Sequence, residues 1–243
     1  MKLAIMQPYF MPYLGYFQAI AAVDKYLLYD RVNFIKRGWI NRNQIYVQNI
    51  GKEYITIPLK TKSSNLLISD VTIDNSLQWR KKILNLIYYN YKRAISFETV
   101  FPLLENIINT KLDTINEYNY TTLNYICNFL EMKTQIEISG IDEYKEIEDY
   151  LKTLSDEDRK NERIFSICKQ QGADTYINAI GGQELYSKEE FIQNGIDLFF
   201  IKMDNIEYKQ FSNEFIPNLS IIDVLMHNGK EGTKELLNKY TLV

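Results

Sequence analysis

The sequence has little cysteine and histidine, and this scarcity limits the chemistry that the chain can perform. Its two cysteines, Cys127 and Cys168, lie far apart without CxxC spacing, so the sequence predicts neither a zinc site nor a disulfide framework. We expect both to be buried as small hydrophobic residues. A single histidine and the absence of a GxSxG motif give a Ser-His-Asp triad little support. The GxGxxG and GxxxxGKS motifs are also absent, which excludes a standard dinucleotide site or P-loop.

Long apolar runs and an excess of positive charge are missing as well. No apolar run is long enough to cross a bilayer, and the amino end MKLAIMQPYF lacks the features of a signal peptide. We therefore expect a cytoplasmic protein with no membrane span. The formal net charge of −3 argues against broad binding to DNA or RNA, because such binding depends on clustered lysine and arginine.

Aromatic residues are abundant. The chain contains 19 tyrosines and 12 phenylalanines, more than a core of this size requires. High Asn, Ile and Lys content indicates an AT-rich coding sequence, which explains a large part of this excess. Tyrosine also suits ligand sites, because it combines an apolar face with a hydroxyl group.

Short apolar runs alternate with helical patterns, which predicts an α/β fold: a Rossmann-like parallel sheet flanked by helices. The expected strands of the sheet are residues 2–6, 26–30, 134–139, 174–179 and 197–202. Residues 44–48 and 53–59 predict a β-hairpin around Asn49 and Gly51, and residues 76–132 predict a helical insertion. Further helices are expected at 161–171, at 187–194, and from Ser220 to a C-cap at Gly229. We expect residues 1–243 to form a single domain.

The loop after the first strand is the first candidate site, because ligands of such sheets bind at the carboxyl ends of the strands, where the strand order reverses. Two prolines and several large aromatic residues stand close together in QPYFMPYLGYF. We expect Gln7, Tyr9, Phe10 and Tyr16 to contact a ligand, and Gly15 to permit close approach of the backbone. The alternative for Tyr16 is packing of the following helix on the sheet.

The second candidate group follows the second strand. Arg42 could hold a phosphate or carboxylate, and Asp30 could orient a ribose or an amine. Trp39, Asn41 and Asn43 would add contacts to the same ligand. The alternative is that Asp30 and Arg42 pair with each other.

The third group belongs to the last helix. Asp223 and His227 stand at i and i+4 on one helical face, a spacing that could tune the pKa of the imidazole for acid–base catalysis. We expect Asp223 to be the more important of the two, with Ser220 as a substrate contact. The alternative for His227 is an interaction with the helix dipole.

A fourth group follows the strand at 174–179. Gly181 and Gly182 could let the backbone approach a ligand, and Tyr186 lies nearby in the sequence. A simple turn explains the two glycines equally well.

The segments QPYFMPYLGYF, GWINRN, YINAIGGQELY and LSIIDVLMHNG together resemble the WbqC-like protein family. The likeness runs from the first strand to the last helix. Members of that family are encoded with genes for O-antigen (lipopolysaccharide) and other surface polysaccharides, and some are associated with attaching an amino acid or acyl group to an amino sugar. The segment IMQPYFMPYLGYFQAI also resembles the HxGH-type loop of adenylate-forming and nucleotidyl-transferring enzymes, although both histidines are absent.

The resemblance implies a role in making or decorating a sugar. Together with the aromatic and hydrogen-bonding residues at the predicted strand ends, it leads us to expect a transferase that attaches an amino-acid or acyl group to a nucleotide-linked amino sugar. The expected partner is a small-molecule nucleotide sugar, and no metal ligands are predicted. An ATP-dependent adenylating ligase, which would require ATP and Mg²⁺, is the alternative enzyme, and a noncatalytic sugar-binding or assembly protein is the alternative outside catalysis. Nothing in the sequence indicates an oligomeric state.

Overall fold

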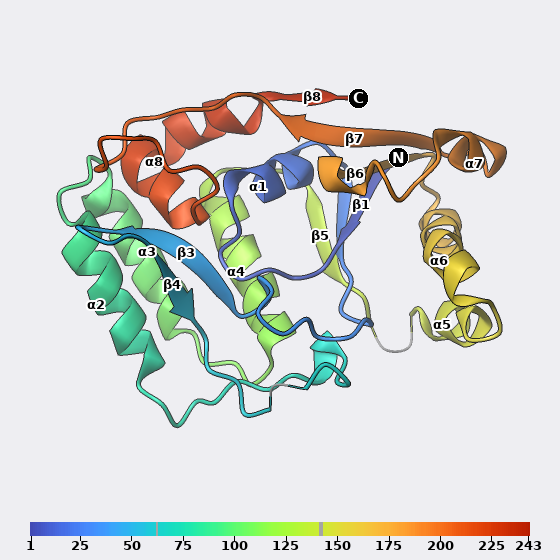
Figure 1. Cartoon of the computed structure of the whole chain (residues 1–243), viewed down its shortest axis with the longest axis horizontal. Coiled ribbons are helices and arrows are strands. Elements are labelled where there is room, and N and C mark those ends of the chain that lie inside the picture. The colour runs from blue at the N-terminus through green and yellow to red at the C-terminus, as the bar shows by residue number, and fades with distance from the viewer. Residues whose placement is uncertain (62, 141–142) are drawn as a thin grey trace.

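A six-stranded, mostly parallel sheet forms the centre of the computed structural model, which describes residues 1–61, 63–140 and 143–243 (Figure 1). The strand order is β5-β2-β1-β6-β7-β8, and only the β7–β8 pair is antiparallel. The strands are β1 (Lys2–Met6), β2 (Lys25–Leu28), β5 (Gln135–Ile138), β6 (Thr175–Ala179), β7 (Asp197–Met203) and β8 (Tyr240–Leu242). The α/β fold that the sequence predicts is therefore confirmed.

The first strand lies in the middle of the sheet. After β1 the chain adds β2 and β5 on one side, and then crosses to the other side for β6 and β7. Leu3 of β1 accordingly pairs with Lys25 of β2 and with Tyr176 of β6. The strand order thus reverses between β1 and β6, and the carboxyl ends of these two strands open at the same edge.

Helices cover both faces of the sheet (Figure 1). They are α1 (Leu14–Ala21), α2 (Trp79–Tyr91), α3 (Phe97–Asn109), α4 (Ile115–Phe129), α5 (Lys145–Leu151), α6 (Asp156–Gln171), α7 (Lys188–Gln193) and α8 (Ile221–Leu237), with short 3-10 turns η1 (Ile68–Asp70) and η2 (Ile180–Gly182). Helices α2, α3 and α4 confirm the predicted helical insertion. No helix in the described ranges is long and apolar enough to cross a membrane.

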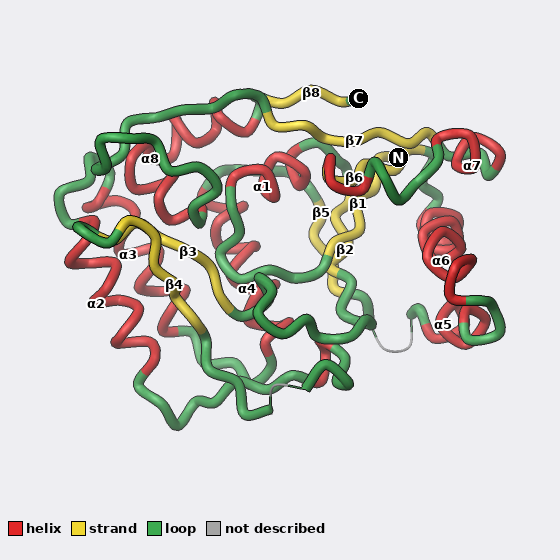
Figure 2. Tube along the Cα trace, viewed as in Figure 1, coloured by secondary structure: helices red, strands yellow, loops and turns green. Residues whose placement is uncertain are grey.

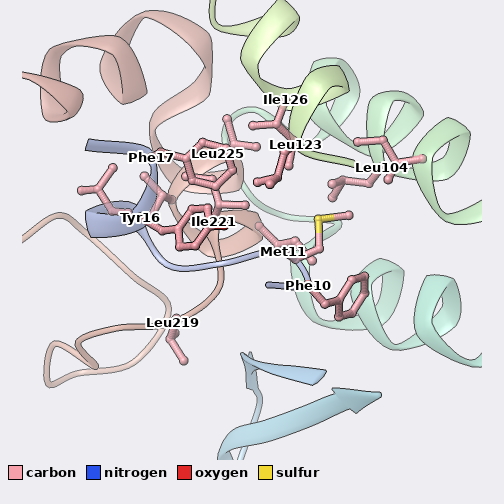
Figure 3. Packing of buried hydrophobic residues seen from close by; sticks show 14 of the residues in the cluster. Phe10, Met11, Tyr16, Phe17, Leu104, Leu123, Ile126, Leu219, Ile221 and Leu225 are labelled. Carbon is pink, nitrogen blue, oxygen red and sulfur yellow. The ribbon is translucent and has the colours of Figure 1, made fainter. Parts of the chain in front are cut away.

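Side chains point alternately to the two faces of the sheet along each strand, and the sheet therefore separates two hydrophobic cores. Leu3 and Leu27 point to the face covered by α6 and α7, whereas Ala4, Tyr26 and Leu28 point to the opposite face, where α1, α4 and α8 pack. Because this alternation has a period of two residues, two apolar residues that are neighbours on a strand enter different cores. The larger core continues into the helical insertion, and Figure 3 shows its packing around α1, α4 and α8.

The hairpin forms a separate two-stranded sheet of β3 (Arg42–Val47) and β4 (Gly51–Thr56), as Figure 2 shows in yellow. Its turn places Asn49 and Gly51 at positive φ, where Asn and Gly are favoured. The Tyr46 amide of β3 donates to the Tyr91 hydroxyl at 2.9 Å, which ties the hairpin to α2. The sequence prediction of a hairpin at this turn is confirmed.

Two expectations were wrong in detail. The sheet has a sixth strand, β8, which is only three residues long and therefore carries no periodic signal. Gly229 does not end the last helix: its left-handed φ of 63° kinks α8, which continues to Leu237. A Cβ atom at Gly229 would lie 2.7 Å from the Ser96 hydroxyl oxygen, so the kink lets α3's N-terminal segment pack closely on α8.

Candidate functional site

A cleft of about 790 Å³ opens at the carboxyl ends of β1, β6 and β7, beside the loop that follows β1. This is the edge at which the strand order reverses. Its lining comprises Met6, Tyr9, Pro12, Tyr13, Gly15, Gln18, Trp39, Asn43, Gln44, Lys52, Ala179, Ile180, Gly181, Ile201, Lys202, Met203, Pro217 and Asn218. Four of the residues that the sequence analysis proposes as substrate contacts are among them: Tyr9, Trp39, Asn43 and Gly181.

Two lysines give the cleft its charge. Lys52 reaches it from β4 and Lys202 from β7, and both side chains are exposed. Within the described lining these are the charged groups, so the cleft favours an anion such as a phosphate. Neither lysine was predicted from the sequence. Lys202 is the last residue of the predicted strand at 197–202, so its place at the ligand-binding edge of the sheet could have been predicted. Lys52 belongs to the separate hairpin, and its position in the cleft depends on how the hairpin packs on the sheet.

Aromatic side chains form one wall. Trp39 is 40% exposed, and Tyr9 and Tyr13 are half-buried in the same lining. Burial raises the pKa of both tyrosines, and the neighbouring Tyr13 raises that of Tyr9 further. Both hydroxyls are therefore protonated at neutral pH and can donate hydrogen bonds to a ligand, while the rings can stack on a base or sugar.

Gln18 of α1 lies at the bottom of this cleft. Its Nε2 donates to the backbone oxygens of Leu236 and Lys239 at 2.9 and 3.0 Å. These two acceptors fix the amide orientation, because a carbonyl oxygen accepts only from the nitrogen side. The Gln18 Oε1 is fully buried and has no hydrogen-bond partner among the described residues.

Buried asparagines hold the loop that borders the cleft. Asn43 donates to the Phe10 and Met11 carbonyls at 3.0 and 2.8 Å, and Asn119 donates to the Pro8 carbonyl at 2.9 Å. Met11 has a positive φ of 43°. The loop thus keeps an unusual backbone conformation because side chains from β3 and α4 satisfy its carbonyl groups.

The last helix holds the same loop from another side. Ser220, which caps α8, donates from its hydroxyl to the Met11 carbonyl at 2.7 Å, and the Ile221 amide donates to the Pro12 carbonyl at 2.8 Å. The Ser220 amide also donates to the Gln44 carbonyl of β3. Ser220 is fully buried, so it joins the loop, the hairpin and α8 and lies outside the lining of the cleft.

Replacing Asn43 with alanine is expected to lower the free energy of unfolding by about 2–3 kcal/mol, because the buried Phe10 carbonyl loses its side-chain donor and the Met11 carbonyl keeps only the Ser220 hydroxyl. Urea denaturation measures this change. Asn213→Ala, at an exposed loop position, is the control and should unfold at the wild-type urea concentration. Equal stability of Asn43→Ala and wild type would show that the asparagine does not hold the loop.

Two predicted contacts in the first loop are core residues. Phe10 is fully buried, with its ring 6.2 Å from that of Tyr118. Tyr16 is also buried and donates to the Gln7 carbonyl at 2.8 Å (Figure 3). The centroid of the Tyr16 ring lies 5.5 Å from that of the Tyr9 ring. Tyr16 therefore packs in the core, which is the alternative stated for it in the sequence analysis.

Asp30 and Arg42 do not pair with each other. Asp30 accepts from the Ser139 hydroxyl and the Asn116 amide, both at 2.7 Å, and burial raises the pKa of its carboxyl group. The Cζ atom of the Arg42 guanidinium lies 4.2 Å from the centroid of the Tyr54 ring. Both residues are engaged in structural contacts and lie outside the described lining of the cleft.

The remaining predicted contacts are dispersed. Asn41 donates to the Ile57 carbonyl at 2.8 Å within the hairpin region. A Cβ atom at Gly182 would lie 2.6 Å from the Asn178 amide nitrogen, so this glycine permits close packing at the end of β6. Tyr186 packs on Phe191 in the core of the opposite face. The predicted residues outside the described lining are Gln7, Phe10, Tyr16, Asp30, Asn41, Arg42, Gly182, Tyr186, Ser220, Asp223 and His227.

Asp223 is the centre of a buried hydrogen-bond network in α8. Its Oδ1 accepts from the Tyr91 hydroxyl, and its Oδ2 accepts from the Tyr208 hydroxyl and from Gln210 Nε2, each at 2.8 Å. Burial and the Asp223 charge raise the pKa of both tyrosines, so both hydroxyls remain donors. Tyr208 and Gln210 come from the segment between β7 and α8. That segment has no periodic pattern, so no sequence signal pointed to these two residues.

His227 lies next to this network without a hydrogen bond to it. Its Nε2 is 3.8 Å from Asp223 Oδ1, and the Phe211 ring is 4.7 Å from the imidazole. Burial lowers the pKa of His227, and Asp223 offsets that effect only in part. The imidazole is therefore neutral at pH 7.

Because His227 is the only histidine in the chain, one substitution tests its contribution to the pH dependence of stability. Because the folded pKa of His227 lies below the ordinary 6.5, the unfolded chain binds the proton more tightly. Stability should therefore fall as the pH drops below about 6.5, towards the folded pKa. We expect His227→Gln to lose this slope when urea midpoints are compared between pH 7.5 and 5.5. An unchanged slope in the variant would contradict the burial of a neutral imidazole.

A second hollow, of about 500 Å³, adjoins the cleft. The two share part of their linings: Tyr13, Met203, Pro217 and Asn218. Asp204, Glu207 and Glu214 give the hollow negative charge, and Tyr208 brings the Asp223 network to its surface. The combined groove is therefore basic at one end and acidic at the other. No group of three or more His, Cys, Asp or Glu side chains in the described ranges is arranged to hold a metal ion.

Fold and groove together define an α/β protein whose main cleft lies at the reversal point of a doubly wound sheet. The chain belongs to the WbqC-like protein family, whose sequence profile matches residues 7–235. It is 30% identical over 233 residues to the uncharacterized protein Rv1507c of Mycobacterium tuberculosis (strain ATCC 25618 / H37Rv), with 95% of each chain covered. No solved structure matches the chain.

Proposed function

We propose that this protein is a transferase that attaches an amino-acid or acyl group to a nucleotide-linked amino sugar in surface-polysaccharide biosynthesis. The observation that carries the proposal is the charge pattern of the groove, with two lysines in the cleft and three carboxylates in the adjoining hollow. A nucleotide-linked amino sugar has the complementary pattern, because its diphosphate is anionic and its amine is cationic when protonated.

The cleft would hold the nucleotide part. Lys52 and Lys202 would neutralise the diphosphate, and Trp39 and Tyr9 would stack on the base or on a sugar ring.

The hollow would hold the amine. In the transfer step the neutral amine nitrogen attacks the carbonyl carbon of an activated acyl or aminoacyl donor. A C–N bond forms, the bond from that carbon to the leaving group breaks, and the proton released from nitrogen goes to a groove carboxylate such as Glu207 or Glu214. Asp223 would position Tyr208 at this end of the groove. Asp30 has no part in this step, since its oxygens are used by Ser139 and Asn116.

A thermal-shift screen tests the proposal. The purified protein is heated with UDP-linked sugars that carry a free amine, with the matching sugars that carry a hydroxyl instead, and with ATP and Mg²⁺. A ligand that binds the folded state raises the midpoint according to its concentration relative to Kd. A larger shift with the amino sugars supports the transferase.

Equal shifts with the amino sugars and the hydroxyl sugars would contradict binding of the amine by the hollow, and two other results would each favour a different function. A shift with ATP and Mg²⁺ alone would favour the adenylating ligase, which the lysine pair would also suit. No shift with any nucleotide would favour a noncatalytic sugar-binding or assembly protein.

A further inference from the structure

The segment that contains α2 has a one-sided charge. Residues 75–97 include five lysine or arginine residues and no aspartate or glutamate, although the whole chain has 28 basic and 31 acidic residues. In Figure 1 this helix lies at the edge of the molecule away from α5, α6 and α7. The local excess of positive charge therefore belongs to one outer surface of a protein that is acidic overall.

Helical periodicity sorts this segment into two faces. Trp79, Ile83, Ile87 and Tyr91 recur every four residues and are buried against the rest of the fold. The outward stripe, which we call the basic face, consists of Lys81, Lys82, Tyr88, Tyr89, Lys92 and Arg93. Lysines and tyrosines thus share the side of the helix that faces solvent.

Apolar groups are unusually exposed on and beside this face. Tyr89 is 67% exposed, and Ile95, in the turn that follows α2, is 87% exposed, the highest value among the large hydrophobic side chains that the structure describes. Lys92 Nζ lies 5.7 Å from the Tyr88 ring centroid and 5.8 Å from that of Tyr89. Leaving such groups in water is unfavourable, so their clustering with cations indicates a surface that has a partner.

The neighbouring elements leave most of this charge uncompensated. Glu105 of α3 lines a hollow of about 550 Å³ between α2 and α3 together with Arg80 and Lys81. Within the described ranges, no ion pair joins a cation of residues 75–97 to a carboxylate.

We propose that the basic face docks the protein on an anionic lipid surface. Lysine and arginine would contact the headgroups, while Tyr88, Tyr89 and Ile95 would enter the boundary between headgroups and acyl chains. A nucleic acid would use the cations but would leave the exposed isoleucine in water, so a lipid surface accounts for more of the face. This inference is independent of the proposed transferase activity.

Flotation with lipid vesicles tests the proposal. The full-length protein is mixed with vesicles of phosphatidylglycerol and phosphatidylcholine, or of phosphatidylcholine alone. We expect binding to the anionic vesicles that weakens as salt is added, and little binding to the neutral ones. The Lys81→Gln/Lys82→Gln variant should bind the anionic vesicles about 25-fold more weakly, because each cation near such a surface contributes about fivefold.

Two further variants test whether vesicle binding depends on the basic face itself or only on the total charge of the protein. Lys145→Gln/Lys169→Gln removes the same charge from exposed positions of α5 and α6 and should bind like wild type. Ile95→Ser leaves the charge unchanged and should weaken binding. The proposal would be overturned by equal binding to neutral vesicles, by no binding, by equal losses in both lysine pairs, or by tighter binding to double-stranded DNA than to the anionic vesicles.

Discussion

Replacing Asp223 with alanine is expected to lower the free energy of unfolding by about 3–5 kcal/mol, the largest stability effect of any single substitution proposed for this chain. The carboxylate is fully buried and accepts hydrogen bonds from Tyr91, Tyr208 and Gln210. Alanine would leave the Tyr91 and Tyr208 hydroxyls without this acceptor, whereas Gln210 Nε2 would keep the Ile216 carbonyl at 3.1 Å. It would also loosen the hairpin, because the Tyr91 hydroxyl accepts from the Tyr46 amide as well.

Urea denaturation of further variants distinguishes the loss of the Asp223 hydrogen bonds from the loss of side-chain volume. Asp223→Asn should be less destabilising than alanine, since it keeps one acceptor oxygen but places an N–H group against a donor. Asp149→Ala, at an exposed position of α5, is the control and should unfold like wild type. If Asp223→Ala unfolds at the wild-type urea concentration, the network does not stabilise the fold in the way that its geometry indicates.

Removing both cleft lysines should weaken binding of a UDP-linked amino sugar about 100-fold. Lys52 and Lys202 lie on different elements and share no partner among the described residues, so their losses of about tenfold each should add as free energies. Isothermal titration of Lys52→Ala, Lys202→Ala and the double variant measures these losses. The stability of each variant should stay near that of wild type, because both side chains are exposed.

Arg42→Ala is the matched control for the lysine variants. The guanidinium lies over Tyr54 and donates to the Gly38 carbonyl, outside the lining of the cleft. Its removal should leave the affinity for the nucleotide sugar unchanged. Loss of binding in Arg42→Ala with normal binding in the lysine variants would move the phosphate site to the hairpin, as the sequence analysis first proposed.

Periodicity explains why the fold was largely predictable. The five parallel strands, the helical insertion and the hairpin each carry a repeated apolar pattern or a turn signal, and the structure has all of them. Strand β8 and helix α5 are too short to carry a periodic signal of this kind.

The candidate site was less predictable, because loops have no period that tells which side chains point outward. In the segment QPYFMPYLGYF the sequence does not separate Tyr9, which lines the cleft, from Phe10 and Tyr16, which are buried. The acidic and basic ends of the groove combine residues of β4, β7 and the segment before α8. Only tertiary contacts bring Lys52 and Lys202 to the same cleft.

If the groove at the reversal point of the sheet binds a nucleotide-linked amino sugar, photo-crosslinking should label the residues around it. A UDP-linked amino sugar carrying a diazirine is irradiated with the wild-type protein, and the labelled peptides are identified by mass spectrometry. We expect labels within residues 9–18, 179–181 and 201–218, which excess unlabelled ligand suppresses. Suppressible labels confined to α2 and α3, or to α5, α6 and α7, would contradict the claim.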